Sequence, residues 1–280
     1  MVITIDLGLG TTYERWALNR ALVQLSIEEK IRSVFEGPGD GISGIVGINS
    51  LPFALRGAEC TVMLDNKEQI AFARQIWKKY APKSNPEIIE IFDNEILPFP
   101  ENTFDLVWNF NVMSRKAESI GLLGELCRIS RRNVLIVVPN RANYSFMFHR
   151  LQHKVSGKPW DHGTIDLMHP NSWKKRLTLN RMIIKRVFYV DCPWWPDIVD
   201  MHEFITDFFP FLDRFSTGLK PEQRMKWDSD HLPYYYPQEN LNVHMQMEKL
   251  ASFEKLHCIP INRFFGHHVA ILAEKPKVGQ

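Results

Sequence analysis

The sequence lacks the features of a protein that crosses a membrane or binds nucleic acid. It contains no apolar run of about 18 residues, and Met1 is not followed by the basic and apolar segments of a secretory leader. Its 34 basic and 32 acidic residues leave a net charge of only +2, without the basic stripe that phosphate binding usually leaves. We therefore expect a cytoplasmic protein that spans no membrane and binds no nucleic acid. The oligomeric state is open.

Cysteine is scarce, and histidine is missing from the first half of the chain. The four cysteines are isolated and form no C-x-x-C pair, so we expect reduced thiols and neither a disulfide framework nor a zinc knuckle. All ten histidines lie between His149 and His268. The polar chemistry specific to this protein is therefore expected in its second half.

The most informative segment is residues 33–47, SVFEGPGDGISGIVG, an apolar run followed by closely spaced glycines. It predicts a buried strand that enters a tight turn, where glycine lets the backbone approach a ligand and the amides of a following helix face it. Residues 39–44 also satisfy the G-x-G-x-x-G pattern of dinucleotide-binding proteins. The segment alone indicates a nucleotide-like cofactor or nothing more than a turn.

Two later segments end in an acid in the same way. Residues 58–65, AECTVMLD, end at Asp65, and residues 86–93, PEIIEIFD, end at Asp93. Ligands of an open parallel sheet lie outside the carboxyl ends of the strands, so both carboxylates and the glycine turn are expected around one ligand. Asp65 falls 24 residues after Gly41, near the spacing of about 20 residues at which an acid from the second strand reaches a ribose hydroxyl. The alternative is that both aspartates cap helices or face solvent.

Residues 97–109, LPFPENTFDLVWN, closely resemble the LPFPDNSFDLV signature of class I S-adenosylmethionine-dependent methyltransferases, especially the branch that modifies small molecules. The resemblance covers residues 31–140 and resumes at FGHHVAILAEKP near the end of the chain. It implies an α/β fold, with a doubly wound, mostly parallel, seven-stranded Rossmann-like sheet whose last strand is antiparallel. The expected organisation is a helical lid over residues 1–32, a cofactor-binding core over 33–140, and the rest of the same domain over 141–280, with acceptor-binding insertions after strands five and six.

The cofactor implied by the resemblance is S-adenosylmethionine. The resemblance assigns to its site Glu36, Gly37, Gly39, Gly41, Asp65, Asn66, Asp93, Asn94 and Asn109. The glycines would lie beside the methionine part, Asp65 would bind the ribose hydroxyls, and Asp93 with Asn94 would meet the adenine. Asn109 would face the sulfonium. Glu36 departs from the family pattern, which places the first acid two residues before the first glycine, where this chain has Phe35.

The second half of the chain is expected to bind the methyl acceptor. If the acceptor must lose a proton, His162 in the loop GKPWDHG is the first candidate for the general base, followed by Tyr144 and His169. The aromatic segments PWWPD, FITDFFPFLDRF and YYYP favour a small apolar or aromatic acceptor, although for any single one of these aromatics a place in the core of the cap is the better explanation.

Two pairs of histidines raise the question of a metal. His149 and His153 are four residues apart in an expected helix and could share a zinc ion. No further ligand pattern accompanies them, and His267 and His268 are consecutive in an expected strand, which sends them to opposite faces. We therefore predict no metal site.

Three functions of different kinds are compatible with these observations. A small-molecule methyltransferase is the prediction, and an NAD-dependent oxidoreductase is the alternative enzyme. The third is a protein that binds S-adenosylmethionine without catalysis, which the shifted position of Glu36 supports. The direction of the last strand separates the first two, because a class I methyltransferase inserts it antiparallel beside the sixth strand.

Overall fold

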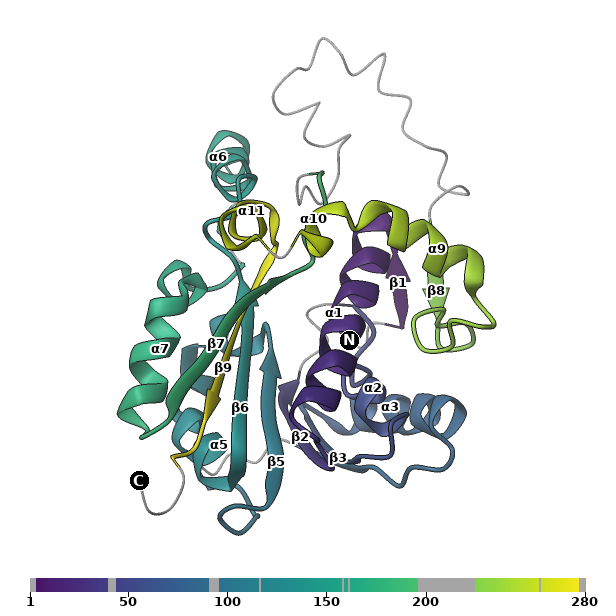
Figure 1. The fold of residues 1–280 in the computed structure, drawn as a ribbon, viewed down its shortest axis with the longest axis vertical. Helices are drawn as coiled ribbons and strands as arrows, with labels where there is room; N and C mark the ends of the chain where they lie inside the picture. Colours follow the sequence, from purple (N-terminus) through teal and green to yellow (C-terminus); the bar gives the residue numbers. More distant parts are fainter. Residues whose placement is uncertain are drawn as a thin grey trace.

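The structure is a computed structural model, and it describes residues 4–39, 44–90, 96–115, 117–157, 159–160, 162–195, 225–256 and 258–276. Its centre is a seven-stranded sheet with the strand order β4-β3-β2-β5-β6-β9-β7 (Figure 1). The strands are β2 (Ser33–Gly39), β3 (Glu59–Leu64), β4 (Glu87–Glu90), β5 (Phe104–Phe110), β6 (Ser130–Pro139), β7 (Ile183–Val190) and β9 (His268–Glu274).

The direction of the last strand decides between the two enzyme classes. The pairs joining β4, β3, β2, β5 and β6 are parallel, whereas β9 is antiparallel to both β6 and β7. This confirms the predicted sheet with an antiparallel last strand. The sheet is not that of the oxidoreductase alternative, because the dinucleotide-binding sheet has the parallel order 3-2-1-4-5-6 without an inserted strand.

Helices cover both faces of the sheet, and each face has its own apolar core. One core contains residues of α1 (Gly8–Glu28), α2 (Leu51–Ala54) and α3 (Lys67–Tyr80), and the other contains residues of α5 (Leu123–Ile129) and α7 (Pro170–Leu179). In β2, Val34 belongs to the first core and Phe35 to the second, because successive strand side chains point to opposite faces. Every residue of β5 is buried, which is typical of a strand covered on both sides.

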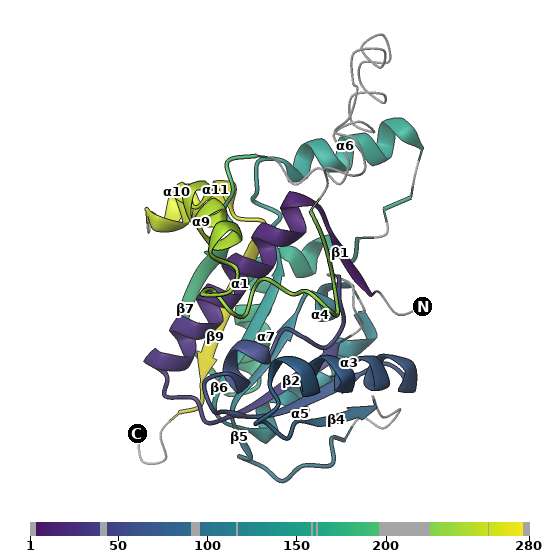
Figure 2. The ribbon, with the colours of Figure 1, turned by 90° about the vertical axis from the view of Figure 1, so that its right-hand side faces the viewer.

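The remaining elements lie mainly around the carboxyl edge of the parallel strands (Figures 1 and 2). They are β1 (Ile5–Leu7), β8 (Lys226–Asp228), α4 (Val112–Arg115), η1 (Ala117–Leu122), α6 (Phe146–Ser156), η2 (Ile165–Met168), α9 (Leu241–Leu250), α10 (Ser252–Lys255) and α11 (Ile259–Phe265). β1 pairs with β8 in a separate two-stranded antiparallel sheet. No helix in the described part of the chain has both the length and the apolar composition that a bilayer crossing needs.

Local sequence explains where α3 begins and ends. The side chain of Asn66 accepts a hydrogen bond from the Gln69 amide (3.0 Å), which caps the first turn. An acidic residue lies in the first turn and two lysines lie in the last, as the helix dipole favours. The indole of Trp77 donates to the Gly47 carbonyl (2.6 Å). α3 is thereby fixed to the segment that follows the glycine turn.

The first helix is part of the core. Tyr13 and Trp16 are 0% and 4% exposed and belong to the core on the α1 face of the sheet. Among the cysteines, Cys60, Cys127 and Cys192 are buried and all four are free thiols. Burial raises the pKa of the Cys127 thiol to about 12, which suits an unreactive core residue.

Candidate functional site

The carboxyl ends of β2 and β3 bring the glycine turn and Asp65 together. Gly39 pairs with Leu64 in the sheet register, so Asp65 is the next residue along the neighbouring strand. An added Cβ at Gly37 would come within 2.9 Å of the Met63 Cβ, and one at Gly39 within 3.0 Å of a Leu64 methyl group. A Cβ at Gly37 would therefore force a shift of the neighbouring strand, whereas one at Gly39 would push the Leu64 methyl group by a few tenths of an ångström. Gly41, Asp93 and Asn94 lie outside the described residues.

Asn109 links the glycine turn to the element that follows β5. Its side chain is 0% exposed; the amide nitrogen donates to the Pro38 carbonyl (2.7 Å), and the amide oxygen accepts from the Met113 backbone N–H (3.1 Å). Asn109 thus holds the backbone at the end of β2 and in α4 in fixed positions. Asp65 is partly exposed at this edge, with its backbone N–H donating to Gln69 (3.2 Å).

Glu36 is directed into the protein. It is 3% exposed, and its carboxylate accepts a hydrogen bond from the Asn49 side chain (3.2 Å). Burial raises the pKa of this carboxyl, and hydrogen bonds from Ser50 and Asn49 and the charge of Arg15 oppose the rise. Glu36, which departs from the family spacing in the sequence, therefore has its carboxylate within the core.

A buried ion pair near Glu36 was not predicted from the sequence. Asp6 accepts hydrogen bonds from Arg15 (3.2 Å), from the Ile45 backbone N–H (2.8 Å) and from the Tyr234 hydroxyl (3.0 Å). Arg15 also donates to the Ile45 carbonyl (2.9 Å) and to Asn49. This network joins β1 and α1 to the segment after the glycine turn. Burial lowers the pKa of Arg15, but Asp6, together with Glu14 and the nearby tyrosines, raises it above its usual value.

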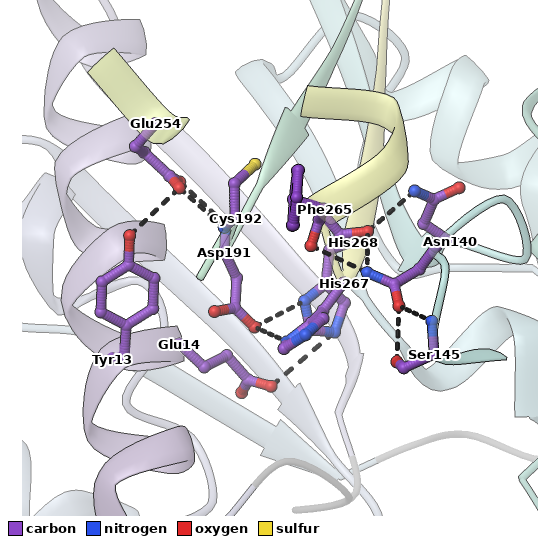
Figure 3. Close-up of polar contacts among 12 residues, drawn as sticks. Tyr13, Glu14, Asn140, Ser145, Asp191, Cys192, Glu254, Phe265, His267 and His268 are labelled. Atoms are coloured by element: carbon purple, nitrogen blue, oxygen red, sulfur yellow. Dashed lines mark hydrogen bonds and ion pairs between the residues drawn. The ribbon is translucent and has the colours of Figure 1, made fainter. Parts of the chain in front are cut away.

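A second buried cluster lies at the other end of the same sheet edge (Figure 3). Asp191 directly follows β7, and its Oδ2 is 3.0 Å from the Nδ1 of His267 and 3.6 Å from the Nδ1 of His268. The Nε2 of His268 is 3.7 Å from a carboxylate oxygen of Glu14 in α1. The prediction that the two histidines face opposite sides is wrong, because His267 precedes β9 and both rings reach one carboxylate.

Opposite charges stabilise the ionised forms in this cluster. Burial raises the pKa of Asp191, but His267 and His268 outweigh that effect and lower it. For His268, burial lowers the pKa, while Asp191 and Glu14 raise it above its usual value. Sequence reasoning missed the cluster, although a signal was present: an antiparallel last strand begins at the edge where the other strands end, next to Asp191.

Neighbouring hydrogen bonds hold this cluster in place. Glu254 accepts from the Tyr13 hydroxyl (3.3 Å) and from the backbone amides of Asp191 and Cys192 (2.8 and 2.7 Å). Asn140, at the end of β6, donates to the carbonyl of Gly266 (2.8 Å) just before the two histidines. Elements from both ends of the chain thereby fix the start of β9 in position (Figure 3).

The matches of the chain to known proteins are in three-dimensional structure alone. No protein-family model matches the sequence, and no curated protein matches it. A SAM-dependent methyltransferase from Thermotoga maritima superposes with a TM-score of 0.51 at 11% identity, over 96% of this chain and 92% of that one. The strand order and this similarity agree. The chain has the class I methyltransferase fold.

Two further solved structures match less of the chain. Magnesium protoporphyrin IX methyltransferase from Synechocystis has a TM-score of 0.48 at 16% identity, over 61% of this chain and 75% of that one. A SAM-dependent methyltransferase from Aquifex aeolicus has a TM-score of 0.44 at 17% identity, over 63% and 86%. Neither adds to the fold assignment.

Within the methyltransferase fold, two of the three acceptor-side candidates have clear structural partners. His169 caps α7: its Nδ1 accepts from the Asn171 backbone N–H (3.1 Å), and burial together with nearby Arg141 lowers its pKa. The Tyr144 hydroxyl donates to the Trp194 carbonyl (3.1 Å), and burial raises its pKa. Both residues thus have structural roles.

His162 lies against two other histidines. Its Nε2 is 2.9 Å from the Nε2 of His153, and its ring centroid is 4.6 Å from that of His149. The next residues pack on α4, where the Thr164 N–H donates to the Ser114 carbonyl (2.9 Å). His162 therefore lies close to the element that follows the carboxyl end of β5. Asp161, its neighbour in the chain, lies outside the described residues.

The aromatic segments have different environments. The hydroxyls of Tyr234, Tyr235 and Tyr236 donate to Asp6 and to the carbonyls of Ile48 and Tyr80, so these residues pack on the cofactor half. Trp195 contacts Tyr13 with ring centroids 5.3 Å apart, and Trp194 is 62% exposed. The segment FITDFFPFLDRF lies outside the described residues.

Proposed function

We propose that the protein is an S-adenosylmethionine-dependent methyltransferase that acts on a small molecule. The observation that carries this proposal is the shared carboxyl edge of β2, β3 and β5. There Gly39, Asp65 and Asn109 are brought together in a sheet with the class I methyltransferase order. Open α/β sheets bind their ligands at this edge.

The side chains at this edge fit the proposed cofactor. Asp65 is a partly exposed carboxylate beside a glycine turn, and a carboxylate is a strong acceptor for the two hydroxyls of a ribose. Asn109 holds the Pro38 carbonyl and α4 in fixed positions, so the backbone around the methionine part is set before binding. When bound, the cofactor supplies a methyl group on a positively charged sulfur. The chain contributes mainly by holding the acceptor in line with it.

Glu36 contributes to this site indirectly. Its carboxylate is within the core and bonded to Asn49, and Asn49 in turn accepts from Arg15. We propose that Glu36 orients the segment after the glycine turn instead of binding the amino group of the cofactor. Asp93 and Asn94 remain proposals for the adenine, and Gly41 and Asn66 for the flanks of the site.

Proton removal from the acceptor is assigned to His162 in preference to Tyr144 and His169. The raised pKa of Tyr144 keeps its hydroxyl protonated, and the Nδ1 lone pair of His169 is occupied by its capping bond. His268 is also a poor base, because its raised pKa favours the imidazolium. The exposed Trp194 is proposed to contact an apolar or aromatic acceptor.

The experiment is a calorimetric titration with S-adenosylhomocysteine, the demethylated cofactor. We expect Asp65→Ala to lose charged hydrogen bonds worth about 1.5–3 kcal/mol, which corresponds to roughly 10- to 100-fold weaker binding. The matched control is Asp230→Ala, because the Asp230 side chain is 88% exposed and pairs with Lys79 on the surface. Unchanged affinity in folded Asp65→Ala, or an equal loss in both variants, would contradict the assignment. Binding without turnover on any acceptor would favour the non-catalytic alternative.

A further inference from the structure

Three histidines that are separated in the sequence form one cluster beside α4. His149 and His153 lie one turn apart on α6, and His162 reaches them from the loop that follows. One ring nitrogen from each lies within 4.8 Å of the others, and all three residues are partly exposed. The ring centroids are 4.6 to 5.0 Å apart. The sequence alone could not bring the third histidine to the pair.

We propose that His149, His153 and His162 bind one zinc ion, with a fourth coordination position left for water or another ligand. Zinc binds imidazole nitrogen at about 2.0–2.1 Å in tetrahedral geometry, which places ligand nitrogens roughly 3.3 Å apart. The observed separation of the His153 and His162 Nε2 atoms is 2.9 Å. The His149 nitrogen lies within 4.8 Å of the other two, so zinc binding requires the imidazole rings to turn toward a common centre.

A backbone carbonyl selects the tautomer of His153 that suits a metal ligand. Its Nδ1 is 2.9 Å from the Pro159 carbonyl, and since a carbonyl only accepts, Nδ1 carries a proton. The nitrogen that would bind the metal is therefore Nε2, which faces the Nε2 of His162. A histidine that binds a metal typically donates its other N–H to a carbonyl or carboxylate in this way.

The loop that carries His162 is fixed on both sides. α6 ends at Gly157, whose φ of +69° lets the chain reverse direction. The indole of Trp160 donates to the Gly163 carbonyl (2.8 Å), and its ring lies 5.0 to 5.6 Å from all three imidazoles. A Cβ at Gly163 would come within 2.6 Å of the Ser114 carbonyl. The histidine cluster is therefore supported by packing and by backbone geometry.

The ligand set favours zinc over the hard cations. Among the residues that the structure describes, the ligands of the cluster are three imidazoles, whereas magnesium and calcium prefer oxygen ligands. Three protein ligands with one open position are characteristic of catalytic zinc sites. A zinc-bound His162 cannot accept a proton, so the role of general base proposed for His162 applies to the metal-free protein. The zinc site is independent of the proposed cofactor site, because it uses none of the same residues.

The test is a titration of the full chain with Co²⁺, a spectroscopic substitute for zinc, followed by displacement with Zn²⁺. We expect one equivalent of tetrahedral Co²⁺, detected by its visible absorption. His153→Ala and His149→Ala should each weaken binding more than about 100-fold, since loss of an outer partner alone costs about 10–100-fold. His231→Ala is the matched control, because this exposed histidine also packs against a tryptophan.

Three readouts keep the result decisive. Thermal melting without metal should be the same for all variants, because the ligands are partly exposed. Affinity for S-adenosylhomocysteine should be unchanged in His153→Ala, which separates failure of this site from failure of the cofactor site. Absence of stoichiometric binding in the wild type, or equal affinity in His153→Ala and His231→Ala, would overturn the proposal.

Discussion

Replacing Asp6 by Asn should destabilise the protein far more than a surface charge change. The side chains of Asp6 and Arg15 are 0% and 2% exposed, so Asp6→Asn leaves a buried guanidinium without its counter-charge. Breaking a buried ion pair by removing one partner typically costs about 3–5 kcal/mol. The same change also weakens the acceptor for the Ile45 amide and the Tyr234 hydroxyl.

The assay is urea unfolding, with Glu248→Gln as the matched control. Glu248 pairs with Arg20 at 2.8 Å, but these side chains are 48% and 50% exposed, so we expect a loss of about 0–1 kcal/mol. In a double-mutant cycle, Asp6→Asn combined with Arg15→Met should cost less than the sum of the single changes, because no buried charge is left alone. A loss for Asp6→Asn equal to that of the control would refute the reasoning.

Two further predictions concern His268 and Asn66. The pKa of His268 is raised in the folded state, so the stability it contributes is fully present below its unfolded value of about 6.5 and declines as pH rises through the folded value. The stability advantage of the wild type over His268→Gln should therefore shrink between pH 6 and pH 9 in urea unfolding, and a constant difference would contradict the ion pairs. Asn66→Ala should lower the free energy of unfolding by about 1 kcal/mol, because α3 loses its cap. Asn66→Ser should retain most of the capping stability. Equal losses of stability in the two variants would argue against capping.

Elements with a strong local signal were predictable from the sequence. The local signal of α3 is of this kind, because its apolar spacing, cap and terminal charges agree. The mostly parallel sheet with an antiparallel last strand followed from the resemblance around residues 97–109, and the structure has it. The chain before β6 has a weaker signal and is divided into η1 and α5, since Gly121 and Gly124 weaken the helix.

The clusters of polar residues depended on tertiary structure. Asp191 meets His267 only because β9 is inserted beside β7, and His162 meets His153 only because the loop after α6 is held on α4. Asp6 pairs with Arg15 across the start of α1, but its role becomes visible only when the Ile45 segment is in place. No pattern of residue spacing in the sequence predicts any of these contacts. The residues at the cofactor-binding edge of the sheet were easier to predict, because the end of each strand could be located separately in the sequence.

A crystal structure of the protein with S-adenosylhomocysteine tests the central claim most directly. The account predicts the ribose hydroxyls within hydrogen-bonding distance of the Asp65 carboxylate, the methionine part beside the Gly39 turn, and the sulfur facing the end of β5 near Asn109. Failure to bind S-adenosylhomocysteine, or binding away from the carboxyl edge of β2 and β3, would contradict it.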